Sequence, residues 1–127
     1  MKLITDVLCN SEFISSLYGE KLSFDDIDLQ EIKFGWNGPI VNFLFYLRDF
    51  PATPPKKWEK FNTILIDLSI YPLDSVSLTK FSRGNKCNLT IITPKNGSLI
   101  VKLTGESEAS FQAKFISIDK VSAHLRI

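Results

Sequence analysis

The sequence predicts a mainly β protein, at most α+β: an antiparallel meander of about seven or eight strands, curled into a sandwich or half-barrel, with one short N-terminal helix packed on it. After residue 24, apolar residues alternate with the period of two that marks a strand burying one face. Turn-forming clusters of Gly, Pro, Asn and Asp interrupt these segments about every ten residues. No long helical pattern separates them, which excludes parallel crossovers. The 127 residues fit one domain, 1–127.

The helix is predicted just after Ser11, which is a good N-cap residue, and it ends at Gly19, a natural C-terminal stop. The apolar side chains between them have helical spacing; they are Phe13, Ile14, Leu17 and Tyr18. A helix of about two turns is stable only when such a stripe lies on a sheet.

The strands follow in order. Residues 27–34 predict a first strand whose alternation slips, which indicates a bulge. Residues 35–39 form a turn cluster, and residues 40–47 are apolar on both sides, which predicts a central strand covered on both faces. A strictly alternating strand is predicted from Asn62 to Ile70. We expect Tyr71–Asp74 to turn the chain and Val76 and Leu78 to return it. Further turns are predicted at residues 82–85 and 94–97, and further strands at 89–91, 99–103, 111–115 and 121–127.

Composition narrows the class of function. Fifteen Lys and Arg against fourteen Asp and Glu give almost no net charge, which argues against a sequence-blind nucleic-acid binder. The sequence shows no secretory signal and no apolar run that could span a membrane, and Cys9 and Cys87 are expected to be reduced. We therefore expect a cytoplasmic protein.

The sequence offers little that resembles catalytic machinery. The single histidine, His124, falls on the polar side of the last strand, so a histidine triad or multi-histidine metal site is not available. Phosphate-loop and nucleophile-elbow motifs are absent, and Cys87 fits a buried, inert thiol. We predict no catalytic residue, no cofactor and no metal.

Charge is concentrated near the N-terminus, where residues 1–31 carry seven acids and two lysines. Asp25, Asp26, Asp28 and Glu31 form the densest acidic group. They lack the turn glycine and ligand spacing of a calcium loop. Two interpretations stay open: a docking surface for a basic partner, and a solvated sheet edge that discourages aggregation.

The two tryptophans lie in predicted loops. Trp36 sits in the first turn cluster, where either an interface role or a role as a plug over a sheet edge is open. Pro54 and Pro55 stiffen the loop before Trp58, which favours packing of that ring on the core. The neighbouring lysines are typical of a solubilising loop; they are Lys56, Lys57 and Lys60.

Several short motifs carry a resemblance to a known family. Pro54-Pro55-Lys56-Lys57-Trp58, Phe61-Asn62-Thr63, Asp74-Ser75-Val76-Ser77-Leu78 with Phe81, and Ile118-x-x-Val121-Ser122-Ala123 resemble segments of the immunity protein 50 family. Phe24-Asp25-Asp26 stands where that family tends to carry an aromatic-His-Asp segment, and this chain has no histidine there.

The resemblance implies a small bacterial cytoplasmic protein, encoded beside a polymorphic toxin, that binds and neutralises the C-terminal domain of that toxin without catalysis. Pro54, Pro55, Trp58 and Asn62 would be structural family positions. Many toxin domains are basic nucleases, so Asp25, Asp26, Asp28, Glu31 and Trp36 become candidates for the toxin-facing surface.

Three alternatives remain at this level. One is a partner- or ligand-binding β domain unrelated to toxins. Another is a small enzyme, which would need Asp26 and Asp67 to converge in one cleft. The last is a nucleic-acid-binding barrel, which would need Lys56, Lys57, Lys80 and Arg83 to line one groove.

Overall fold

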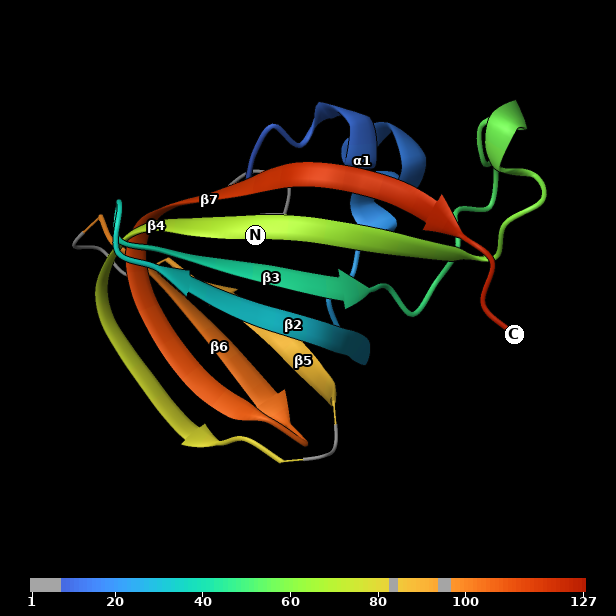
Figure 1. Cartoon of the computed structure of the whole chain (residues 1–127). Helices are drawn as coiled ribbons and strands as arrows, with labels where there is room; N and C mark the ends of the chain where they lie inside the picture. The colour runs from blue at the N-terminus through green and yellow to red at the C-terminus, as the bar shows by residue number, and fades with distance from the viewer. Residues whose placement is uncertain (1–7, 83–84, 94–96) are drawn as a thin grey trace.

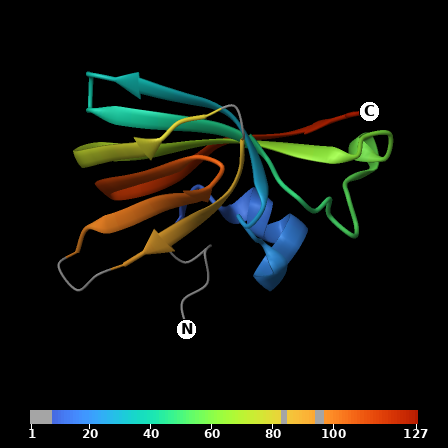
Figure 2. The same ribbon diagram turned by 90° about the horizontal axis from the view of Figure 1, so that it is seen from below.

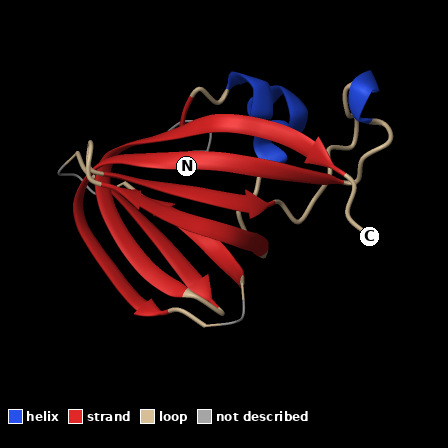
Figure 3. Cartoon of the chain, in the orientation of Figure 1, coloured by secondary structure: helices blue, strands red, loops and turns tan. Residues whose placement is uncertain are grey.

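The computed structural model describes residues 8–82, 85–93 and 97–127 (Figure 1). The elements are, in order, β1 (Leu8–Cys9), α1 (Glu12–Tyr18), the 3-10 turn η2 (Gly19–Lys21), β2 (Ile27–Gly35), β3 (Ile40–Tyr46), the 3-10 turn η3 (Lys56–Trp58), β4 (Thr63–Lys80), β5 (Lys86–Ile92), β6 (Leu99–Gly105) and β7 (Glu108–His124). The mainly β fold predicted from the sequence, with one short N-terminal helix, is confirmed (Figure 3).

The strands form one sheet in the order β1-β7-β4-β3-β2-β5-β6, and β6 pairs again with β7. All pairings are antiparallel except that of β1 with β7, which is parallel. Because β7 pairs with both β4 and β6, the sheet curls back on itself (Figures 1 and 2). Among the strands β2 to β7, the shortest pairing is between β2 and β5, which pair only at Ile27 and Asp28. The molecule is therefore a partly closed barrel.

One predicted turn is wrong. Tyr71–Asp74 does not reverse the chain, and Val76 and Leu78 belong to the same strand as Ile70, because β4 continues from Thr63 to Lys80. Its partner β7 is almost as long and pairs with it from Thr63 to Lys80, while register shifts after Asp67, Leu73 and Leu78 let the pair bend. Pro72 lies just beyond Ile70, where the ladder with β3 ends, so it does not interrupt that ladder.

The other predictions for the first half of the chain fare better. β2 carries the expected bulge, between Leu29 and Glu31, and residues 36–39 form the expected turn. β3 is central, but only one face is fully covered: Val41, Phe43 and Phe45 are buried, whereas the residues between them are half-buried. Of the turns predicted at residues 82–85 and 94–97, residues 83–84 and 94–96 lie outside the described residues.

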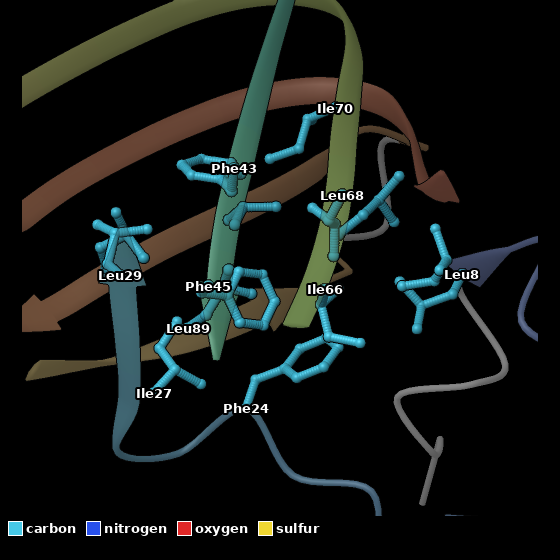
Figure 4. Packing of buried hydrophobic residues seen from close by; sticks show 14 of the residues in the cluster. Leu8, Phe24, Ile27, Leu29, Phe43, Phe45, Ile66, Leu68, Ile70 and Leu89 are labelled. Carbon is cyan, nitrogen blue, oxygen red and sulfur yellow. The ribbon is translucent and has the colours of Figure 1, made fainter. Parts of the chain in front are cut away.

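The core fills the space that the curled sheet encloses. Phe24, Phe43, Phe45 and Phe111 are almost fully buried, and their rings meet edge to face, Phe24 on Phe45 and Phe43 on Phe111. The inward side chains of β2, β3, β4 and β5 surround them (Figure 4). Alternation along each strand thus supplies one continuous apolar interior.

The helix covers one end of this interior. Ile14 of α1 is fully buried in the same core cluster, and Phe13 packs edge-on against Trp58 with ring centres 5.5 Å apart. Tyr18 Oη donates to the backbone oxygen of Asp49 at 2.7 Å, which fixes the end of α1 to the loop after β3. No described helix has the length and apolar character needed to cross a membrane.

Both cysteines are free thiols, Cys9 exposed on β1 and Cys87 buried on β5. Burial raises the pKa of the Cys87 thiol to about 11, with smaller contributions from Glu106 and Asp28. At neutral pH this thiol is protonated and shielded from solvent, which are the properties of an inert core residue.

Alkylation of the native protein at pH 8 should therefore modify Cys9 and spare Cys87, because only the thiolate of an accessible cysteine reacts quickly. Mass spectrometry of digested protein, before and after unfolding in denaturant, measures both sites, and Cys9→Ser is the control. Equal rates at the two thiols in the native protein would contradict the buried position of Cys87.

Gly105 ends β6 opposite Cys87 and has a φ of +129°. A Cβ there would stand 2.8 Å from the Lys86 backbone oxygen, whereas Gly97, with a φ of +85°, has open space around it. We expect Gly105→Ala to lower the free energy of unfolding by about 2 to 4 kcal/mol, through backbone strain and steric overlap together.

Gly97→Ala is the matched control, since it introduces strain without overlap and should cost about 1 kcal/mol. Denaturant unfolding followed by circular dichroism gives both values. Equal losses in the two variants would show that the close approach of β6 to Lys86 contributes nothing.

Candidate functional site

The acidic residues predicted from the sequence lie along β2 and the turn before it. Asp25 and Asp26 are exposed in that turn, where the Asp26 backbone N–H donates to Asn88 Oδ1 at 2.7 Å and its φ is +52°. Asp49 raises the pKa of Arg48, with smaller contributions from Asp25 and Asp26, so this arginine lies within electrostatic reach of the turn. Asp25 and Asp26 therefore present accessible negative charge, with one cation nearby.

Asp28 has a different environment. Arg126 Nη1 donates to Asp28 Oδ2 at 2.8 Å, and the same guanidinium lies 4.1 Å from the centre of the Tyr46 ring. The Asn62 side-chain amide makes two hydrogen bonds to the backbone of Arg126: it donates to the Arg126 oxygen at 2.7 Å and accepts from the Arg126 N–H at 2.8 Å. The Asp28 charge is thus compensated within the protein, as is that of Glu31, whose carboxylate lies 3.3 Å from Lys33 Nζ.

Trp36 lies at the other end of β2. Its side chain is 98% exposed in the turn to β3, which excludes a role as a plug over the sheet edge. A nine-residue strand is about 30 Å long, so Asp25 and Asp26 cannot adjoin Trp36 on one small patch. The structure separates the predicted surface into an acidic end and a tryptophan end, with Glu31 between them.

An apolar groove of about 470 Å³ lies beside Trp36. The end of β2, the following turn and the bend of β4 line it; the lining residues are Phe34, Gly35, Trp36, Pro39, Leu73, Asp74, Ser75 and Val76. Phe34 is 54% exposed and its ring centre is 6.3 Å from that of buried Phe111, so it links the groove to the core. We call this feature the Trp36 groove.

The strand that forms one wall of this groove has an unpaired side. From Ser75 to Lys80, β4 pairs with β7, while its ladder with β3 has ended at Ile70 and its last contact on that side is Leu73 N–H to Pro39 O at 2.9 Å. No strand in the described ranges pairs with the other side of Ser75–Lys80. In Figure 1 this yellow-green half of β4 runs away from β2. We call Ser75–Lys80 the open edge of β4.

The residues named for the small-enzyme alternative do not converge. Asp26 lies before β2, whereas Asp67 lies on β4 with β3 between them, and the Asn42 side chain donates to Asp67. His124 contacts Ser122 Oγ at 3.1 Å and packs edge-on against Tyr46. Within the part of the chain that the structure describes, no group of three His, Cys, Asp or Glu residues could hold a metal ion.

The residues named for the nucleic-acid alternative are also scattered. Lys56 and Lys57 lie in η3, near the C-terminus, and Lys80 ends β4 at the far side of the barrel (Figure 1). Arg83 lies outside the described residues. Lys56, Lys57 and Lys80 therefore do not line the single basic groove that this alternative requires.

The positions named as structural occupy the end of the barrel that carries η3. Trp58 is buried after Pro54 and Pro55, and Asn62 anchors the C-terminal segment through Arg126. Reasoning from sequence missed the Asp28–Arg126 contact and the open edge of β4. Neither has a local signal, since each depends on strands that lie far apart in the chain.

One comparison with known proteins identifies the family of this chain. No curated protein and no solved structure matches the chain. The family model described as "Immunity protein 50" matches residues 10–124, which covers the helix and reaches the end of β7. That span includes almost the whole fold and every motif that carried the resemblance, so the chain belongs to the immunity protein 50 family.

Proposed function

We propose that this protein binds a cognate bacterial toxin domain in the cytoplasm of the producing cell and neutralises it by covering its active site. The match of residues 10–124 to the immunity protein 50 family is the observation that carries the proposal. An inhibitor of this kind acts without catalysis of its own. It needs a rigid scaffold and an exposed surface complementary to one target.

The Trp36 groove is the best-suited surface for the centre of such a contact. Exposed tryptophans beside apolar pockets are enriched among residues that dominate binding energy. Phe34 and Val76 adjoin Trp36 and are also exposed, so a partner would bury a connected apolar area rather than isolated side chains. We place the toxin contact here.

The acidic end of β2 supplies a second element of the proposal. Asp25 and Asp26 would attract a basic toxin such as a nuclease and speed the encounter. Glu31, further along, contributes less because its carboxylate lies 3.3 Å from Lys33 Nζ. Asp28 contributes less to this attraction because Arg126 compensates its charge.

Co-expression tests the function directly. The C-terminal domain encoded beside this gene should arrest growth of a host cell when expressed alone, and co-expression of this protein should restore growth. Pull-down should recover the two as a complex. Arrest that continues despite folded, abundant protein would reject neutralisation, and the same protein binding an unrelated partner would favour the generic binding domain.

Trp36→Ala should weaken toxin binding at least about tenfold, because truncating a central aromatic anchor commonly costs more than 1.4 kcal/mol. The melting temperature should stay unchanged, since the side chain is almost fully exposed. Isothermal titration calorimetry measures the affinity, and Leu125→Ala, at an exposed position of the C-terminal segment, is the control. Equal affinities for the parent and Trp36→Ala would remove the groove from the interface.

Replacing Asp25 and Asp26 by asparagine should slow association with a basic toxin about threefold to tenfold at low salt, and the difference should shrink as salt is raised. Asparagine tolerates the positive φ of Asp26, so the turn is preserved. Stopped-flow measurements give the association rates. Glu59→Lys, in the loop after η3, changes the net charge by the same amount at another place, so comparing the two variants separates the effect of the charge at Asp25 and Asp26 from that of the total charge. An identical effect of both changes would dismiss a specific acidic surface.

A further inference from the structure

The open edge of β4 carries an inference about how the partner is bound. A strand edge presents unpaired N–H and C=O groups every second residue, and such edges bind extended segments of other chains. Natural proteins usually protect exposed edges with charges, prolines or bulges. On β4, the register shifts fall after Leu73 and after Leu78, and the segment from Ser75 to Leu78 between them pairs regularly with β7.

This segment lacks the usual protection by charge. Ser75, Val76, Ser77, Leu78 and Thr79 are all uncharged, with Asp74 before them and Lys80 after them. Protection by charge would cost little stability at such exposed positions, so its absence is consistent with an edge that pairs with a partner.

Two side chains of the edge, Val76 and Leu78, lie on the inward face of the sheet beside Phe111 and Ala109 of β7, which we call the apolar floor. Val76 pairs with Phe111 and Leu78 with Ala109, and directly paired residues share a face of the sheet. Phe111 and Ala109 are buried, so Val76 and Leu78 also face inward, yet they remain 43% and 46% exposed. No described strand pairs with β4 beside them on the side of β2, where Phe34 and Val76 line the Trp36 groove. An added strand would bury these two side chains and satisfy the unpaired backbone groups together.

We propose that an extended segment of the toxin adds to the open edge of β4 as an antiparallel strand, beside the Trp36 groove. This inference rests on the proposed function and names the mode of contact. In this proposal the toxin segment carries two apolar side chains, two residues apart, that contact Val76 and Leu78. A basic residue faces Asp74 and an acidic residue faces Lys80, because opposite charges across a strand pair are favourable.

Hydrogen exchange gives the direct test. The probe is the C-terminal domain encoded beside this gene, with its activity disabled, mixed with the intact protein. Amides in the peptides that cover Ser75–Lys80 should exchange at least about tenfold more slowly in the complex, since strand pairing protects them. Leu78→Lys should weaken the complex at least about tenfold by placing a charge on the apolar floor.

Leu125→Lys is the matched control, because it makes the same substitution at a residue that is 61% exposed and distant from the edge, and it should change affinity less than about twofold. Melting temperatures of both variants establish that they are folded. Slow exchange of Ser75–Lys80 that appears only in the complex supports the inference even if Leu78→Lys unfolds the protein.

The outcomes separate this inference from the proposed function. A tight complex that leaves exchange of Ser75–Lys80 unchanged would overturn strand addition and leave neutralisation intact. Protection of the same residues in the free protein, rising with concentration together with a dimer mass in light scattering, would assign the edge to a second copy and overturn the toxin contact there. No complex at all would reject the proposed function itself.

Discussion

The pairing of β4 with β7 is the constraint on which the rest of the structure depends. These strands stay together from Thr63 to Lys80, through a bend that takes them from one wall of the barrel to the other. The first half of β4 also pairs with β3. The early part of β7, which lies beside the second half of β4, pairs on its other side with β6. A single bent pair of strands therefore belongs to both walls and forces the sheet to curl. The enclosed core follows from that curvature.

The bend also explains why one edge stays open. β3 and β2 end at the turn of residues 36–39, level with Ile70, and β4 bends away with β7 just beyond that point, so the second half of β4 has no neighbour on this side. β5 does not restore the contact, because it meets β2 only at Ile27 and Asp28. The barrel is consequently incomplete between β2 and the far half of β4. The Trp36 groove lies where these strands separate.

The sequence was informative where a feature is local. Alternation and turn clusters correctly placed β3 and the turn before it, and the slip near Glu31 revealed the bulge of β2. The interpretation failed at Tyr71–Asp74 because a proline beside an acid is a local turn signal, whereas the partner that keeps β4 extended lies about forty residues further along the chain. Strand pairing at such distances leaves no periodic trace.

The same reasoning applies to the candidate site. Composition identified Trp36 and the acids, but only the fold shows that Trp36 and Asp25 lie at opposite ends of one strand. The charge of Asp28 is compensated by Arg126, 98 residues away in the chain. Asn62 holds the backbone of Arg126 in place, and the sequence identified this asparagine only as a motif position. A count of charged residues in the sequence therefore overestimates the charge presented to a partner, because ion pairs within the fold compensate part of that charge.

Closing a barrel and keeping a binding edge are opposing demands on one sheet. Full closure would pair every backbone group and bury Val76 and Leu78, which adds stability but removes any place for another strand. This protein closes the barrel through β6 and β7, covers one end with α1, and leaves the gap where the apolar floor is backed by Phe111. The core is complete without the missing strand, since Phe111 and Phe43 are fully buried in its absence. A partner that fills the gap would therefore meet a preformed surface, and little of its binding energy would be spent on ordering the protein.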